Sequence, residues 1–197
     1  MENRLTLIIF DVAARLKVPA IIIGGLALPA YEVGRTTLDI DICIHVNSQE
    51  RLNQFVGKLK EENIQTLQVP KVDHDLFLVF GKNNEAEIWL KPCDAFNWDE
   101  RMLERLQAYF ANVKVLAVED FIMTKLARSD RSSVDIDDIL QILINNYKRI
   151  DWEYLQYRLR WIDLQEDFEE IVRGLKLVSN QDHRVTAQKI LDKLDLH

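Results

Sequence analysis

Residues 21–46, IIIGGLALPAYEVGRTTLDIDICIHV, constrain the fold more than any other stretch of this 197-residue chain. The apolar run Ala20–Ile23 is typical of a short buried strand, and it ends at the glycine pair Gly24 and Gly25. A helix-like segment follows, and then a second apolar run, Leu38–Val46, that is typical of a longer strand. A strand, a glycine turn, a helical segment and another strand in such quick succession predict a core that mixes helices and strands.

Two carboxylates interrupt the second apolar run. Asp39 and Asp41 are two residues apart, so in a strand they would project from one face, while Leu38, Ile40 and the following isoleucines would face the core. Neighbouring carboxylates repel each other unless a cation lies between them. Hard oxygen ligands on a strand suit Mg²⁺ or Mn²⁺, which complete their coordination with water and substrate phosphates.

A lone Asp-x-Asp would more simply be the solvent-facing side of an edge strand. Here the preceding glycines, Gly24 and Gly25, would expose backbone N–H groups at a helix start, where an anion can approach closely. Glycines that could hold phosphates, followed by carboxylates that could hold a metal, favour a site for a metal-bound phosphate compound. His45 and Cys43 would lie on the same strand face as the aspartates, and for His45 an ordinary, partly buried histidine is favoured.

The remaining pattern divides the chain near residue 117. Asn47, with Glu50 three residues later, has the capping-box pattern of a helix start, and Asn97 is expected to cap another helix. Before residue 117, helices are expected at the N-terminus (Leu5, Ile8, Val12 and Leu16 at helical spacing), after residue 47 and over 97–110, and strands over 75–81, 85–91 and 113–117. Beyond it the stretches 118–128, 134–147, 151–164 and 182–196 are all helical in period. We therefore expect an α/β core over residues 1–117 and a helical domain over 118–197.

Composition excludes several classes of protein. A net charge of −7 and a pI near 5.2 argue against a broad nucleic-acid-binding surface, which needs clustered Lys and Arg. No apolar run approaches the roughly 20 residues of a membrane helix, and the first residues lack the features of a signal peptide. The two cysteines have no metal-binding spacing, which favours a cytoplasmic protein without disulfides.

The stretch GGLALPAYEVGRTTLDIDI resembles the signature of the DNA polymerase β-like nucleotidyltransferase superfamily, especially its small bacterial members related to the AbiEii toxins. In those proteins Gly-Gly, an Ala-Leu pair, Arg-Thr or Arg-Ser and an Asp-apolar-Asp follow in this order. The matching positions are Gly24, Gly25, Ala27, Leu28, Arg35, Thr36, Asp39 and Asp41. The resemblance implies an α+β fold, in which a mixed sheet flanked by helices is followed by a C-terminal helical bundle. It also implies that Gly24, Gly25, Arg35 and Thr36 contact a nucleoside triphosphate and that Asp39 and Asp41 are catalytic metal ligands.

The family carries a third metal-binding carboxylate on a neighbouring strand. Glu87 matches it best, because it lies within the predicted strand 85–91, whereas Glu85 and Asp94 are rivals. An exposed glutamate beside a hairpin is an equal alternative for Glu87, and the family more often has Asp at this position.

A second block, residues 118–140, resembles the downstream motifs of the AbiEii-like group. The residues that match these motifs are Glu119, Lys125, Asp135 and Asp138. Lys125 would contact the nucleotide phosphates as a point charge, and Asp135 and Asp138 would orient it or act as a base on the acceptor. Alternatively, Asp135 and Asp138 are acids favoured by the helix dipole at a helix start. The family has a basic residue where this chain has Val134, so Arg128 or Arg131 would have to replace it.

The implied reaction is metal-dependent transfer of a nucleoside monophosphate from an NTP to an acceptor hydroxyl. The acceptors in question are RNA such as tRNA, a protein or a small molecule, and a toxin-like role would bring a cognate antitoxin as partner. Two alternatives stay open: a non-catalytic, antitoxin-like protein with this fold, and an aminoglycoside-type nucleotidyltransferase.

Overall fold

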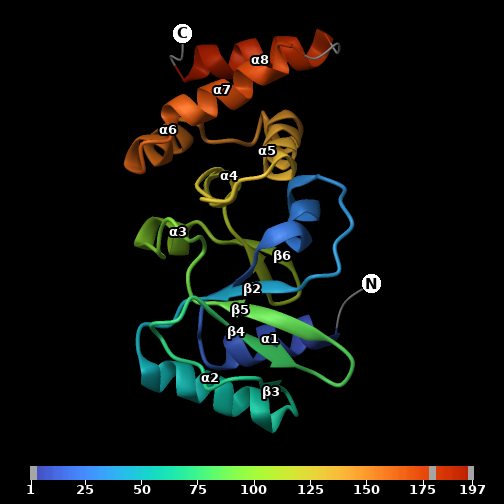
Figure 1. Cartoon of the computed structure of the whole chain (residues 1–197), viewed down its shortest axis with the longest axis vertical. Helices are drawn as coiled ribbons and strands as arrows, with labels where there is room; N and C mark the ends of the chain where they lie inside the picture. Colours follow the sequence, from blue (N-terminus) through green and yellow to red (C-terminus); the bar gives the residue numbers. More distant parts are fainter. Residues whose placement is uncertain (1–3, 178–180, 195–197) are drawn as a thin grey trace. The chain divides into compact units, whose positions relative to one another are not determined.

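The computed structural model describes residues 4–177 and 181–194, which divide into two compact units (Figure 1). One unit runs to Ala30 and resumes from Arg35 to Leu116, and the other comprises Tyr31–Gly34 and the chain from Ala117 onward. The main break thus falls between Leu116 and Ala117. A short segment of the N-terminal half also belongs with the C-terminal helices, which the sequence did not suggest.

A five-stranded mixed sheet forms the frame of the first unit, within the described residues. Its order is β1 (Ala20–Ile22), β2 (Asp41–Ile44), β5 (Glu85–Trp89), β4 (Leu76–Phe80) and β3 (Gln65–Thr66). β2 and β5 run parallel, and the other neighbours are antiparallel. The parallel register places Asp41 beside Glu87 and Ile42 beside Ile88. The expected mixed sheet is confirmed.

Two amphipathic helices lie on the same side of this sheet (Figure 1). In α1 (Arg4–Arg15) the buried positions include Leu5, Ile9 and Val12, whereas Ile8 is only partly buried. α2 (Gln49–Glu61) buries Leu52, Phe55, Val56 and Leu59, the positions that its period predicted. Its cap was predicted one residue too early: Ser48, not Asn47, accepts a hydrogen bond from the N–H of Arg51, because Ser48 has the extended backbone that an N-cap needs.

The strand expected over Leu38–Val46 is shorter than predicted. β2 begins at Asp41, and Leu38, which was expected in the core, is 93% exposed. Ile40, Ile42 and Ile44 are buried as expected. On β2, the ladder with β1 covers only Ile42 to Ile44, and Ile42 pairs with Ile22. Because Leu38 precedes this ladder, strand pairing with β1 does not direct its side chain into the core.

The helix expected over residues 97–110 was also wrong in part. α3 covers only Glu100–Glu104 and is capped by Asp99, not Asn97. The following residues form β6 (Gln107–Phe110), which pairs antiparallel with β7 (Val113–Val115). A hairpin partner that arrives only later in the sequence thus overrides the local helical pattern.

The second unit is a set of helices around Phe121, Ile142, Leu155 and Phe168, which are all fully buried. The helices are α4 (Val118–Leu126), α5 (Ser133–Asn146), α6 (Trp152–Trp161), α7 (Gln165–Leu175) and α8 (Gln181–Lys193). α7 was not predicted, and the end of the stretch 182–196 lies outside the described residues.

The segment Tyr31–Gly34 belongs to this unit through several specific contacts, two of them at Tyr31. The Tyr31 ring stacks on Phe121 with centroids 4.4 Å apart, and the Asn146 amide donates a hydrogen bond of 2.7 Å to the Tyr31 carbonyl. Across the described ranges, no helix has the length and apolar character needed to cross a membrane.

Candidate active site

The carboxylate of Asp41 lies directly against the backbone of Gly24. Ile23 donates a backbone hydrogen bond to the Asp41 carbonyl at 3.0 Å, so the end of β1 is held beside the start of β2. Gly24 has a φ of +63°, a conformation that favours glycine, and a Cβ there would overlap Oδ2 of Asp41. The glycine is therefore required both for the turn and for the space that the carboxylate occupies.

Thr37 connects the second glycine to the first aspartate. A Cβ on Gly25 would lie 3.2 Å from the Cβ and the methyl group of Thr37, so the two residues are in close contact. The Thr37 hydroxyl oxygen accepts a hydrogen bond of 3.2 Å from the N–H of Asp39. Sequence reasoning missed Thr37, although a threonine hydroxyl commonly accepts a hydrogen bond from the backbone N–H two residues later in a side-chain turn.

Asp39, Asp41 and Glu87 line one cavity of about 340 Å³, which we call the carboxylate cavity. Its other lining residues are Leu38, Ile40, Leu78, Glu85 and Ala86. The parallel pairing of β2 with β5 brings Glu87 to it, since the N–H of Glu87 donates to the Ile40 carbonyl at 2.9 Å. The lining contains four carboxylates and no basic side chain, so the cavity is suited to a cation.

The three candidates for the third carboxylate are placed differently. Glu87 and Glu85 both line the carboxylate cavity, whereas the exposed Asp94 does not. Oε2 of Glu87 accepts a hydrogen bond of 3.0 Å from the indole N–H of Trp89, which fixes the direction of that carboxylate.

The donor set fits a metal ion in part. Oxygen-only donors on two neighbouring strands are the chemistry that Mg²⁺ prefers, and Mg²⁺ commonly uses only one or two protein carboxylates. Among residues 4–177 and 181–194, no three His, Cys, Asp or Glu side chains are grouped so that they could hold a metal ion by themselves.

Arg35 and Thr36 are exposed and lie in the segment between the glycine turn and β2. The glycine turn itself is η1 (Gly24–Tyr31), a 3₁₀-helix that contains Pro29 rather than the ordinary helix the sequence suggested. Neither Arg35 nor Thr36 is among the residues that line the carboxylate cavity.

In the second unit, Lys125 lies between two aspartates of α5. Its Nζ is 2.8 Å from Asp138 Oδ2 and 3.4 Å from Asp135 Oδ1, and the lysine is only 6% exposed. Lys125 is therefore not a solvated surface residue. Asp135 also forms the capping box of α5, because its Oδ2 accepts hydrogen bonds from the N–H and hydroxyl of Ser132.

The environment of Asp135 keeps its carboxylate ionised. Burial acts to raise the pKa of Asp135, but the hydrogen bonds from Ser132 and the charges of Lys125 and Arg128 outweigh it, so the pKa is lowered. Arg128 also pairs with Asp130 at 3.0 Å.

The other polar residues of the downstream block hold the helices together. Glu119 accepts a hydrogen bond of 2.7 Å from the N–H of Asp151. Arg131, the second candidate to replace a basic residue at Val134, pairs with Asp167 of α7 at 2.8 Å.

His45 and Cys43 have no arrangement typical of a catalytic pair. The His45 ring stacks on Trp98 with centroids 5.7 Å apart, and burial lowers the pKa of His45. Cys43 is fully buried, and burial raises the pKa of its thiol, which disfavours the reactive thiolate.

Comparison with solved structures finds proteins with a similar fold. The chain is similar to a candidate nucleotidyltransferase from H. pylori, at 19% identity and a TM-score of 0.52 over 98% of this chain and 94% of that one. It is also similar to JHP933 from Helicobacter pylori (18% identity, TM-score 0.53, 98% and 91% covered). A third neighbour is the antibiotic-resistance factor ANT(2'')-Ia (16% identity, TM-score 0.51, 84% and 96% covered).

At these identities the structures establish a shared fold, the nucleotidyltransferase fold that the resemblance implied. No curated protein sequence matches the chain. A protein family described as nucleotidyltransferases of unknown function (DUF6036) matches residues 4–179, which is most of the sequence. The chain therefore belongs to this nucleotidyltransferase family.

Proposed function

We propose that the chain transfers a nucleoside monophosphate from an NTP to an acceptor hydroxyl at the carboxylate cavity. One observation carries the proposal: left-handed Gly24 is held against Asp41, at a cavity that Asp39 and Glu87 also line. Glycine backbone next to paired carboxylates is the combination needed to bring phosphates and a metal ion together.

The charge of the cavity supports a requirement for a divalent cation. Its four carboxylates would repel a triphosphate, so an NTP needs Mg²⁺ or Mn²⁺ between the two sets of oxygens. Asp39 and Asp41 would hold the ion, with Glu87 as a further ligand. When bound, it would neutralise phosphate charge and polarise the phosphorus that is attacked.

The other residues would position the substrates. The backbone N–H groups of Gly24 and Gly25 would contact phosphate oxygens, with Arg35 and Thr36 as exposed neighbours in the chain. The resemblance gives Lys125 a contact with the phosphates, and its ion pairs with Asp135 and Asp138 within the second unit favour an orienting role for those aspartates over a role as base.

The acidity of the cavity favours a cationic small-molecule acceptor over RNA. A polyanionic acceptor such as tRNA would meet repulsion from the four carboxylates as well as from a net charge of −7. The structural neighbour ANT(2'')-Ia has been solved with adenylyl-2''-tobramycin. A protein acceptor, in a toxin-like role with a cognate antitoxin, is the next candidate.

A second candidate function, a non-catalytic protein with the same fold, is favoured by one observation. Although four carboxylates line the cavity, no three of the described His, Cys, Asp or Glu side chains are grouped so that they could hold a metal ion by themselves. This candidate predicts that nucleotide transfer is absent even when an NTP binds.

Incubation with each α-phosphate-labelled NTP, Mg²⁺ and a cell lysate tests the proposal. The label should appear on an RNA, protein or small-molecule fraction, which ribonuclease, protease and ultrafiltration distinguish. Asp39→Asn/Asp41→Asn should abolish labelling, and Asp73→Asn, an exposed control away from the cavity, should not. If the wild-type protein binds an NTP but labels none of these fractions, the non-catalytic candidate is the correct one.

A further inference from the structure

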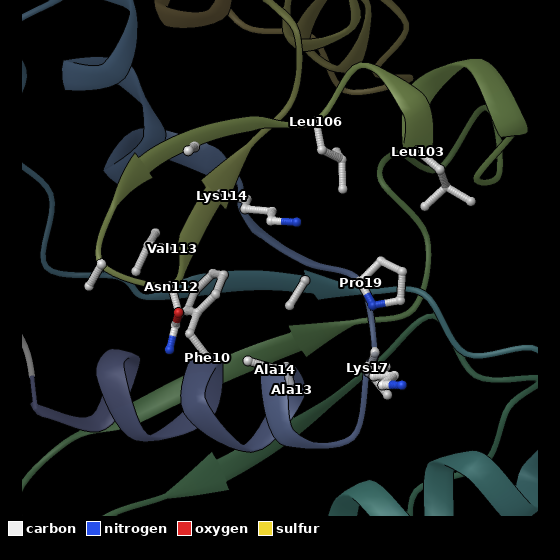
Figure 2. A pocket seen from close by; sticks show the side chains of 14 residues that line it. Phe10, Ala13, Ala14, Lys17, Pro19, Leu103, Leu106, Asn112, Val113 and Lys114 are labelled. Carbon is white, nitrogen blue, oxygen red and sulfur yellow. The ribbon is translucent and has the colours of Figure 1, made fainter.

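A second and larger cavity, of about 490 Å³, lies entirely within the first unit. Its walls come from α1, from the start of β1, from α3 and the chain after it, and from the β6–β7 hairpin, and they are mostly apolar (Figure 2). The wall residues that matter most are Phe10, Ala13, Pro19, Leu103, Leu106 and Val113. The volume is within the range of about 300–1,000 Å³ that is typical of small-molecule sites, so we call it the apolar pocket.

The apolar pocket is separate from the carboxylate cavity. The two have no lining residue in common. The apolar pocket reaches Ala20 at the start of β1, whereas Gly24 follows the end of β1, beside Asp41. A ligand in the apolar pocket would therefore not be the substrate of the proposed transfer reaction.

The charged residues that line the apolar pocket are all positive. Lys17 and Lys114 line it, and no acidic side chain does, although the chain as a whole carries a net charge of −7. Figure 2 shows the two lysines coming from different segments: Lys17 lies in the chain just after α1, and Lys114 lies in β7. Within the described ranges, neither ammonium group takes part in an ion pair.

Lys17 occupies a position where glycine would be expected. It follows the last residues of α1 with a φ of 53°, and the N–H of Val18 closes the helix by donating to the Ala13 carbonyl at 2.8 Å. Helices commonly end in this way with a left-handed glycine. The lysine is thus a costly residue for the backbone here, and it is an exposed, positively charged member of the pocket lining.

We propose that the apolar pocket binds a small amphipathic anion: an aliphatic body in the apolar part and one carboxylate or phosphate head attracted by the positive charge that the exposed Lys17 and Lys114 give the lining. The lysines are point charges that can pair with either head group. They would repel a cationic ligand, because no acidic side chain in the lining offsets their charge. This inference is independent of the proposed transfer reaction.

Calorimetric titration with four eight-carbon probes tests the inference: octanoate, octyl phosphate, octanol and octylammonium. Octanoate or octyl phosphate should bind, and the tighter of the two identifies the preferred head group. Octanol should bind roughly tenfold or more weakly because it lacks the charge-assisted contact, and octylammonium should not bind. Equal binding of octanol and both anions, or no binding by either anion, would overturn the proposal.

Variants separate the lysines from general effects on folding. Lys17→Gly removes the ammonium group but suits the left-handed backbone, so its unfolding temperature should equal or exceed that of the wild type while anion affinity falls about tenfold. Lys114→Gln should reduce affinity similarly, and Ala14→Phe should fill the pocket and block all the probes. Lys60→Gln, on the exposed face of α2, should leave affinity unchanged. Wild-type anion affinity in Lys17→Gly/Lys114→Gln would contradict the assignment.

Discussion

Gly24 shows how the absence of one side chain sets the geometry of the candidate active site. The left-handed φ and the contact with Asp41 Oδ2 both exclude a Cβ, and each alone would select glycine. Sequence alone marked Gly24 and Asp41 as important, but only the antiparallel register of β1 and β2 brings them into contact. Contacts of this kind depend on strand pairing, so they could not be read from spacing.

Gly24→Ala should destabilise the protein by about 2 kcal/mol, because a left-handed alanine is strained and its Cβ displaces the Asp41 carboxylate. Chemical denaturation measures the loss, and metal-dependent nucleotide binding should fall with it. Gly34→Ala is the matched control, since no atom lies within 4 Å of a Cβ there, and it should change stability by less than about 0.5 kcal/mol. Equal effects of the two substitutions would contradict the steric argument.

Thr6 carries a polar group that gains nothing from its place in the core. It is 3% exposed in α1, and its hydroxyl has no hydrogen-bond partner among the described residues. Thr6→Val should therefore stabilise the protein by about 1 kcal/mol. Thr124→Val should instead destabilise it by about 1 kcal/mol, because the Thr124 hydroxyl donates to the Phe121 carbonyl at 2.7 Å. Thermal unfolding of both variants checks the pair, and a loss of stability in Thr6→Val would refute this account.

At the scale of elements, α4 and α5 are joined by the buried contacts of Lys125. Lys125→Met should destabilise the protein by about 3 kcal/mol, because it removes the ammonium group that pairs with the buried carboxylates of Asp138 and Asp135. Adding Asp138→Leu should recover much of that loss. NTP affinity measured in the stable double variant then separates the two roles of Lys125: unchanged affinity means a structural lysine, and a tenfold or greater loss means a phosphate contact.

The same helix pair should give an acid-sensitive contribution to stability. The pKa of Asp135 is lowered in the folded protein, so the folded state favours the ionised carboxylate. That contribution is fully present above the ordinary Asp value of 3.8 and is lost as the pH falls through the lower folded value. Asp135→Asn should flatten the acid side of the stability profile measured by denaturant titration. Asp137→Asn, an exposed neighbour, should leave the profile unchanged.

Elements were predictable where one local signal decided them. The buried stripe of α2 and the β4–β5 hairpin follow directly from periodicity, because burial on one face determines both. The local pattern predicted a helix after Glu104, but these residues form the strand β6. The reason is that β7 supplies a pairing partner, which no local pattern reveals. The predicted N-cap of α2 differs from the observed one by one residue, because Asn47 and Ser48 have nearly equal capping preferences. The backbone geometry selects Ser48.

At the scale of the whole molecule, the main break between the two compact units falls between Leu116 and Ala117. The assignment of Tyr31–Gly34 to the helical unit was not predictable. It depends on Tyr31 stacking on Phe121 and on Asn146 reaching the Tyr31 carbonyl, contacts between residues far apart in sequence. The sequence marked the carboxylates of the candidate site. That Glu85 lines the cavity as well as Glu87 follows from the parallel pairing of β5 with β2.

The stability of the whole chain should report on the carboxylate cavity. If Asp39 and Asp41 hold a cation that anchors an NTP, then Mg²⁺ and NTP at a hundred times the dissociation constant should stabilise the wild-type protein by about 2.7 kcal/mol. Asp39→Asn and Asp41→Asn should lose this stabilisation, yet without metal they should be at least as stable as the wild type, because one source of carboxylate repulsion is removed. Asp73→Asn controls for the loss of a charge elsewhere on the unit and should retain the full response. Thermal unfolding with Mg²⁺ alone, NTP alone and both together makes the measurement. A response to NTP and Mg²⁺ that survives in both cavity variants would show that nucleotide binding lies elsewhere.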